Sequence, residues 1–337
     1  MLAAVCYKAG KIRIENRDTP VPGAGDVLIK IAYCGICPSD YRIYQGLSSV
    51  KLPIVPGHEF SGWIESVGDE VENITIGSRV VVDPAQKCYT QCPACRHGYY
   101  NKCIKMADAY NGFAQYHVTR AANVFTLKEN TDLIAASITE PLACVLRGVE
   151  KAKIKAGDVV VVVGSGPIGL LHLQSAKFFG ATVIVADYSS ERLDCALELG
   201  ADFVVNPLTT NLENVVLEVS DGWGANAVIV AASSTTAVEN SVNLLGVGGT
   251  LVIFAGIRND SMVVLDSKRI HYDEINITGS SDYSDADFIK ALHFIEMGYL
   301  DTKKIISDTV TLENIEKGMK LVSSGNRLKV MVNIGDV

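Results

Sequence analysis

The chain has 337 residues, of which 48% are hydrophobic and 20% are charged, and its formal net charge is −8. This length exceeds one ordinary core, so we expect two domains, and the acidic balance argues against nucleic acid as the main partner. We see no secretory signal pattern and no apolar run of about 20 residues, so no membrane partner is expected. Nine cysteines in such a chain favour free thiols and metal ligands in the cytoplasm over a disulfide framework, which is the alternative.

Residues 1–125 are predicted to form a compact all-β module. The segments 11–18, 26–36 and 77–84 are rich in strand-forming residues, and turns with glycine and proline separate them.

Four cysteines lie close together in the spacing Cys88-x3-Cys92-x2-Cys95-x7-Cys103. The first three alone resemble an iron–sulfur motif, but that interpretation leaves Cys103 without a role. Four thiolates together are typical of a closed, structural zinc site. An empty or oxidised lobe is the alternative.

A second set of possible metal ligands consists of Cys37, His58, Glu59 and, much later, Glu140. Sulfur, nitrogen and oxygen ligands together suit zinc, and a catalytic zinc keeps one position open. We therefore expect one closed and one open zinc site. The alternatives are an ordinary buried thiol for Cys37 and a helix cap for Glu140.

From about residue 155 the pattern changes to alternating strands and helices. Strands rich in Val, Ile and Ala, at 158–163, 181–188, 202–206, 225–233, 249–256 and 274–280, alternate with amphipathic segments. Such strands predict a six-stranded, doubly wound parallel sheet covered on both faces, so the fold class is α/β. A helix at 285–298 and a closing strand at 327–334 follow.

The loop Gly164-Ser165-Gly166-Pro167-Ile168-Gly169 follows the valine-rich strand and opens a helix. In this context a G-x-G-x-x-G motif predicts a dinucleotide site. Gly164 permits the tight turn, Gly166 lets a pyrophosphate approach the backbone, and Gly169 allows close packing of helix on strand. A plain strand–helix turn is the alternative.

The end of the second parallel strand predicts which cofactor binds. Asp187 would accept hydrogen bonds from the ribose hydroxyls and repel a 2′-phosphate, so we expect NAD rather than NADP. Arg192 tempers this expectation because it could take a phosphate, and Asp187 could instead cap a helix. Ala255 and Gly256 are also expected at the cofactor.

The order of these motifs is similar to that of a known family. C-G-x-C-x-S-D at 34–40, G-H-E-x-x-G-x-x-x-x-V-G-x-x-V at 57–71, the cysteine lobe, Glu140-Pro141 and the glycine loop resemble the zinc-dependent medium-chain alcohol dehydrogenases, and Glu59 with Glu140 resembles the sorbitol (polyol) branch. The resemblance implies a GroES-like β-barrel domain at 1–147, with its lobe at 88–103, completed by 290–337. It implies a Rossmann NAD-binding domain at 148–289.

The resemblance also implies a role for each matching residue. Cys37 and His58 would bind the catalytic zinc, with Glu59 or Glu140 as the remaining contact, directly or through water. Ser39 would pass the alcohol proton toward solvent, and Asp40 would orient His58. The four lobe residues, Cys88, Cys92, Cys95 and Cys103, would bind the structural zinc.

The implied reaction moves hydride from a secondary alcohol to NAD and gives a ketone, with zinc as the Lewis acid. The expected substrate is a small polyol, sugar alcohol, cyclitol or alditol phosphate. We expect a homodimer or homotetramer, with the apolar run 249–257 as a contact surface.

Two features depart from the family pattern. Three residues, rather than the usual two, separate Cys88 from Cys92, and Arg42 stands where many relatives carry a histidine of the proton relay. A guanidinium keeps its proton at any working pH and cannot relay one. We hypothesise that Arg42 instead favours an anionic or phosphorylated substrate.

Three other functions are alternatives. They are a threonine-type 3-hydroxy-amino-acid dehydrogenase, a zinc-free quinone or enone reductase, and a non-enzymatic NAD-binding protein. The ligands Cys37, His58 and Glu59 argue against a zinc-free reductase.

Overall fold

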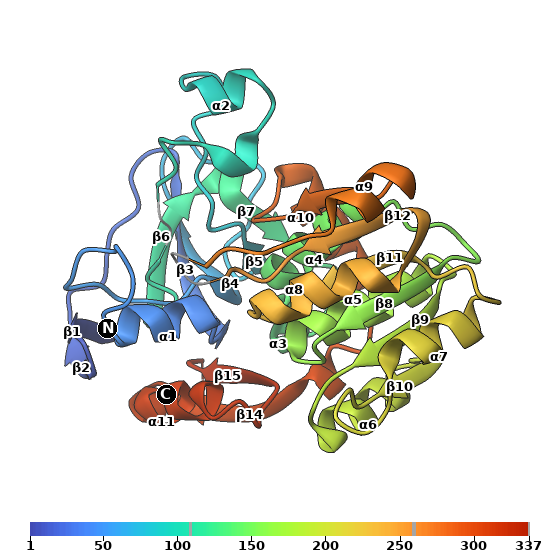
Figure 1. The fold of residues 1–337 in the computed structure, drawn as a ribbon. Helices are drawn as coiled ribbons and strands as arrows, with labels where there is room; N and C mark the ends of the chain where they lie inside the picture. The colour runs from blue at the N-terminus through green and yellow to red at the C-terminus, as the bar shows by residue number, and fades with distance from the viewer. Residues whose placement is uncertain (108–109, 258–260, 336–337) are drawn as a thin grey trace. The chain divides into compact units, whose positions relative to one another are not determined.

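The computed structural model describes residues 1–107, 110–257 and 261–335. The chain forms two compact units (Figure 1). Unit 1 comprises Met1–Pro141, Ser284–Gly298 and Ile305–Val337, and unit 2 comprises Leu142–Tyr283 and Tyr299–Lys304. The chain passes from unit 1 to unit 2 after Pro141 and returns to unit 1 at Ser284, slightly before the expected domain boundaries at 147 and 289. The expected boundaries stay a prediction.

Unit 1 is built around a seven-stranded sheet whose central strand is β3 (Asp26–Gly35). The sheet runs in the order β14-β15-β3-β4-β5-β7, and β6 also pairs with β3. The remaining strands are β4 (Glu59–Val67), β5 (Arg79–Val82), β6 (Tyr116–Arg120), β7 (Val124–Thr126), β14 (Ile306–Thr311) and β15 (Lys329–Asn333). The closing strand therefore joins the N-terminal sheet, and β1 (Leu2–Lys8) and β2 (Lys11–Asn16) form a separate hairpin.

The core of unit 1 contains buried apolar side chains from both ends of the chain. Ile29 and Phe60, from β3 and β4, cluster with Met319 from α11 (Ile315–Ser323). Gly318 lets α11 pack closely, since a Cβ there would press on the side chains of Ile36 and Val310. Burial of Ile29, Phe60 and Met319 stabilises the folded unit by about 1.5–3 kcal/mol per side chain and holds the end of β3 in place.

Most of the other helices of unit 1 are short. Cys37 is the N-cap of α1 (Pro38–Tyr44), where Pro38 occupies the first helical position that proline favours. In Figure 1 the loop that carries α2 projects from the strands of this unit. The remaining helical segments are α2 (Pro93–Arg96), η1 (Tyr100–Lys102), η2 (Ala121–Asn123), α3 (Leu133–Ala136), α10 (Asp285–Glu296) and η5 (Leu312–Asn314).

Unit 2 contains the predicted parallel sheet, in the order β10-β9-β8-β11-β12-β13. Numbered along the chain this order is 3-2-1-4-5-6, which confirms the doubly wound fold. The strands are β8 (Val159–Val163), β9 (Thr182–Ala186), β10 (Phe203–Val205), β11 (Ala225–Val230), β12 (Leu245–Ile253) and β13 (Asn276–Gly279). Val160, Val161 and Val162 are fully buried, as a strand covered on both faces requires.

The helices of unit 2 are α4 (Thr139–Ala152), which begins in unit 1, then α5 (Pro167–Phe178), α6 (Ser190–Glu198), α7 (Leu212–Val219), α8 (Thr235–Ser241), η3 (Val242–Leu244), α9 (Ser267–Tyr272) and η4 (Lys303–Ile305). Most of them connect these strands, whereas α4 precedes the first strand and η4 follows the last. None of the helices in the described ranges combines the length and apolar character that crossing a membrane requires.

One expectation about the sheet of unit 2 is wrong. The apolar run 249–257 was expected to be a contact surface between subunits, but most of it lies in β12, between β11 and β13. Leu251 and Val252 are fully buried there. The edge of the sheet on this side is β13 instead.

Candidate metal and cofactor sites

The four lobe cysteines converge on one point. Their sulfur atoms all lie within 4.8 Å of one another, with 3.7 Å between Cys88 and Cys95 and 3.9 Å between Cys92 and Cys103. In a tetrahedral zinc site with bonds of about 2.3 Å, two sulfurs lie about 3.8 Å apart. All nine cysteines lie in described residues and are free thiols. The cluster therefore fits a four-thiolate zinc site.

The extra residue between Cys88 and Cys92 is absorbed by a left-handed turn. Tyr89 has a φ of 56°, and the Thr90 N–H donates to the Cys88 carbonyl at 2.7 Å. The Tyr89 ring packs against Tyr100, with ring centroids 6.0 Å apart. This packing and the local hydrogen bond offset the cost of a conformation that L-residues rarely adopt.

A buried lysine anchors the lobe at its first cysteine. Lys87 pairs with Asp83 at 3.2 Å and with Asp285 on α10, and its side chain is fully buried. The two carboxylates come from segments far apart in the sequence, so the lobe is tied to the rest of unit 1.

The second ligand set also comes together. Cys37, His58 and Glu59 each offer one ligand atom within 4.8 Å of the others. Gly35 at the end of β3 is the register partner of Glu59 at the start of β4, so the antiparallel pair brings the flanking Cys37 and His58 to the same place. One sulfur, one nitrogen and one oxygen form a donor set that fits zinc and leaves a coordination position open.

Asp40 holds both segments of this cluster. One carboxylate oxygen accepts the Cys37 N–H at 2.9 Å, and the other accepts the Gly57 N–H at 2.9 Å and lies 3.3 Å from His58 Nδ1. Burial alone would lower the pKa of His58, but the Asp40 carboxylate and Cys37 raise it well above its ordinary value. Nδ1 faces Asp40, so Nε2 is the nitrogen left for a metal.

Glu140 and Ser39 are placed differently. Glu140 lies in the first turn of α4 and does not belong to the three-residue ligand group within the described chain. Burial, and then the Glu59 carboxylate, raise the pKa of Glu140 to about 8. Ser39 is exposed in the first turn of α1.

Lys329 is a site residue that the sequence analysis missed. It lies in β15, is only 6% exposed, and forms an ion pair with Glu59. Burial alone would lower the pKa of Lys329, but Glu59 and Cys37 raise it above its ordinary value. A lysine at the start of an otherwise apolar strand, LKVMV, was the available signal.

In unit 2 the glycine loop has the geometry that the motif predicts. Gly164 has a φ of 99°, and a Cβ at Gly169 would overlap the Gly164 carbonyl. At Gly166, the N-cap of α5, a Cβ would have only Arg192 Nη1 within 4 Å among the described residues, at 3.9 Å. Protein packing thus does not demand a glycine at 166, and the open space beside the helix N-terminus fits a cofactor pyrophosphate.

Asp187 lies directly against this loop. Its carboxylate accepts the N–H groups of Ser165 at 2.7 Å and Ser189 at 3.0 Å, and Arg192 Nη1 lies 4.0 Å away. Ser189, not Asp187, is the N-cap of α6. Ala255 and Gly256 follow the carboxyl end of β12, at the sheet edge where β8 leads into the glycine loop, and a Cβ at Gly256 would meet open space among the described residues.

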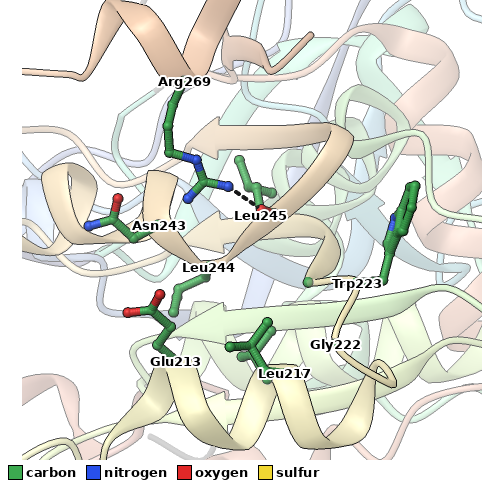
Figure 2. Close-up of a pocket in the computed structure, with 10 residues that line it drawn as sticks. Glu213, Leu217, Gly222, Trp223, Asn243, Leu244, Leu245 and Arg269 are labelled. Atoms are coloured by element: carbon green, nitrogen blue, oxygen red, sulfur yellow. Dashed lines mark hydrogen bonds between the residues drawn. The ribbon is translucent and has the colours of Figure 1, made fainter. Parts of the chain in front are cut away.

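Unit 2 also has a cavity of about 460 Å³, shown in Figure 2, that contains none of the predicted site residues. It is lined by α7, by the turn around Trp223, by η3 and the start of β12, and by Arg269 of α9. These segments include the amino ends of β11 and β12, whereas the glycine loop follows the carboxyl end of β8. We therefore assign this cavity no part in cofactor binding.

Two family models match the chain. Residues 23–129 match the alcohol dehydrogenase GroES-like domain, and residues 167–297 match the zinc-binding dehydrogenase model. The first match covers β3 to β7 of the unit 1 sheet with the lobe, and the second covers most of unit 2 from the end of the glycine loop onward.

Relatives with named dehydrogenase activities match over nearly the whole chain. A sorbitol dehydrogenase of Halalkalibacterium halodurans is 32% identical, with 97% of this chain and 96% of the relative covered. A D-arabitol-phosphate dehydrogenase of Enterococcus avium is 34% identical, with 94% and 92% covered.

Solved structures of dehydrogenases also match nearly the whole chain. A zinc-binding dehydrogenase structure from Sinorhizobium meliloti bound to NADP is 29% identical, covers 98% of both chains and has a TM-score of 0.94. An alcohol dehydrogenase of E. coli in complex with NADH is 30% identical, covers 99% of both chains and has a TM-score of 0.91. The chain therefore belongs to the zinc-binding medium-chain alcohol dehydrogenases, in the branch that contains the sorbitol and other polyol dehydrogenases.

Proposed function

We propose that the protein is a zinc- and NAD-dependent dehydrogenase that oxidises a secondary alcohol of a polyol, sugar alcohol or cyclitol to a ketone. The observation that carries this proposal is the cluster of Cys37, His58 and Glu59 in a chain whose second unit has a dinucleotide loop. The names of the relatives favour polyols over 3-hydroxy amino acids.

Cys37, His58 and Glu59 would hold the catalytic zinc. When bound, zinc supplies a Lewis acid that lowers the pKa of a substrate hydroxyl. Asp40 keeps the proton on His58 Nδ1 and thereby directs Nε2 toward the metal. Ser39 Oγ accepts a hydrogen bond from the substrate hydroxyl and moves its proton toward solvent. Glu140 keeps a supporting role, since it lies outside the ligand group of the described chain.

The glycine loop and Asp187 would bind NAD. Asp187 is already fixed by two backbone N–H groups, so its carboxylate is in place to accept the ribose hydroxyls without moving. A 2′-phosphate there would face a carboxylate, and we therefore propose a preference for NAD over NADP. Pro167 and Ile168 in the first turn of α5, Arg192, Ala255 and Gly256 complete the proposed cofactor site.

A phosphorylated alditol is the second candidate substrate. Arg42 is exposed and lies three residues after Ser39 on α1, so the two side chains share a helix face. An exposed guanidinium on the face of the proton-accepting serine suits a phosphate. The D-arabitol-phosphate dehydrogenase is a relative whose name includes such a substrate.

The lobe cysteines would bind a structural zinc, because four thiolates leave no position for a substrate. For the assembly we propose a homodimer or homotetramer that uses the edge strand β13, whose Ile277 side chain is 37% exposed. The nine free thiols support a reducing compartment, and we propose the cytoplasm.

The test is a substrate screen with the zinc-loaded protein. Alditols, alditol phosphates, inositols and threonine are each offered with NAD and with NADP, and reduced cofactor is followed by absorbance. Turnover of an alditol, cyclitol or alditol phosphate is expected, and Cys37→Ala should abolish it. Turnover of threonine alone, or activity that survives removal of zinc, would reject the proposal.

A further inference from the structure

A buried ion pair connects the last strand of unit 1 to the open metal cluster. Lys329 in β15 and Glu59 in β4 are separated by β3, which pairs with both strands. Both side chains are almost fully buried, at 7% and 2% exposure. The Lys329 ammonium also donates to the Ile36 carbonyl at 3.3 Å. The lysine is therefore fixed by two partners.

A glycine in the strand between the two residues makes room for the pair. A Cβ at Gly35 would overlap both the Glu59 carboxylate and the Lys329 side chain. The carboxylate lies between two cation positions, because Glu59 pairs with Lys329 and also belongs to the ligand group with Cys37 and His58. A divalent cation in that group and the lysine would compete for the same carboxylate charge.

We propose that Lys329 is a positioning residue that competes with the catalytic zinc for the Glu59 carboxylate and so weakens the bond between this ligand and the metal. The inference rests on the zinc site of the proposed function. It adds that the strength of this site is set by a residue that contributes no ligand atom.

If Lys329 had a purely structural role, its removal would change the rate of zinc release in the opposite direction. If Lys329 only stabilised the fold, its removal would loosen the cluster and speed the loss of zinc. If it competes for Glu59, its removal lowers the charge repulsion and frees the carboxylate, so zinc is held longer. The direction of the change in zinc release therefore separates the two roles.

The experiment measures metal release from the full-length protein with a chromophoric chelator. Cobalt loading distinguishes the two sites, since one thiolate and four thiolates give different absorption bands. In Lys329→Met we expect the catalytic-site ion to leave at least about tenfold more slowly than in the wild type. Lys329→Arg, which keeps the charge, should release it at a rate close to that of the wild type. The lobe ion should be unaffected in both variants.

Glu59→Gln provides the decisive background. The proposed effect acts through the Glu59 charge. Adding Lys329→Met to Glu59→Gln should therefore change the rate of metal release by less than about twofold. The double variant removes both charges of the pair, so neither is left buried without the other. Faster or unchanged release in Lys329→Met, or an equal effect in the Glu59→Gln background, would overturn the inference. If the wild type shows no one-thiolate ion, the proposed zinc site itself fails, which is a separate result.

Discussion

His58 and Asp40 are in direct contact at the open metal cluster, with 3.3 Å between His58 Nδ1 and an Asp40 oxygen that also accepts the Gly57 N–H. This carboxylate is fully buried, so it orients the ring without access to solvent. Metal-bound histidines generally depend on such a partner for their tautomer and orientation.

We expect Asp40→Asn to lower both zinc affinity and kcat/KM by about 10- to 100-fold, because an amide matches the carboxylate in size but not in charge. Chelator competition and steady-state kinetics measure the two effects. Asp132→Asn is the matched control, since Asp132 caps α3 in the same unit and is not part of either metal cluster. Wild-type zinc affinity in Asp40→Asn would contradict the role of Asp40.

Replacing one lobe cysteine tests whether the three-residue spacing still binds metal. We expect Cys95→Ser to reduce zinc from two ions per chain to one, given the two ligand groups of the described chain. The unfolding temperature should fall because metal binding contributes to folding. Atomic absorption and calorimetry check both effects. Cys195→Ser on α6, outside both groups, should retain two ions.

Asp187 makes cofactor choice testable with two variants. Asp187→Ala removes the charge and both oxygens that accept the Ser165 and Ser189 N–H groups, whereas Asp187→Asn removes the charge but keeps one of the two acceptor oxygens. We expect both to improve the ratio of NADP to NAD use by about tenfold or more, and only Asp187→Ala to weaken NAD binding severely. Kinetics with both cofactors check this. An unchanged ratio in both variants would show that Asp187 does not select the cofactor.

His172 predicts an acid-sensitive stability. Burial lowers the pKa of His172 to about 3. Neither ring nitrogen has a hydrogen-bond partner within the described chain. An unfolded histidine has a pKa of about 6.5, so the unfolded state takes up a proton first as the pH falls. The free energy of unfolding should then drop by up to about 1.4 kcal/mol per pH unit between about pH 6 and pH 4.

In His172→Leu the free energy of unfolding should fall less steeply with pH, by the contribution of one proton. Urea titrations at several pH values measure this slope. His271→Leu, at an exposed position on α9, should leave the slope unchanged. His117 keeps a similar contribution in the variant, because burial lowers its pKa to about 4. Equal slopes for the wild type and His172→Leu would refute the assignment.

Lys87 and Lys128 allow the ion pairs of a buried lysine and of an exposed lysine to be compared. Lys87→Met leaves Asp83 and Asp285 without their cation and should cost about 3–5 kcal/mol of unfolding free energy. Lys128, whose side chain is 59% exposed, pairs with Glu296 at 3.2 Å, and Lys128→Met should cost about 1 kcal/mol or less. Chemical denaturation measures both, and similar costs would contradict the anchoring of the lobe by Lys87.

The sequence by itself determined the features that depend on residues close along the chain. The valine-rich strands, the glycine loop and the cysteine spacing specify local backbone shape and burial, so the parallel sheet, the dinucleotide loop and the two metal clusters could be anticipated. The structure confirms the doubly wound parallel sheet and brings together the four lobe cysteines, and Cys37 with His58 and Glu59.

Only the tertiary structure decided which distant side chains share a site. Glu59 lies in the ligand group of the described chain and Glu140 does not, and no local pattern distinguishes the two carboxylates. The contact of Lys329 with Glu59 arises because β15 and β4 both pair with β3. Tyr89 absorbs the extra lobe residue through a left-handed backbone. Such outcomes depend on strand register and on packing between segments far apart in sequence, which residue spacing does not encode.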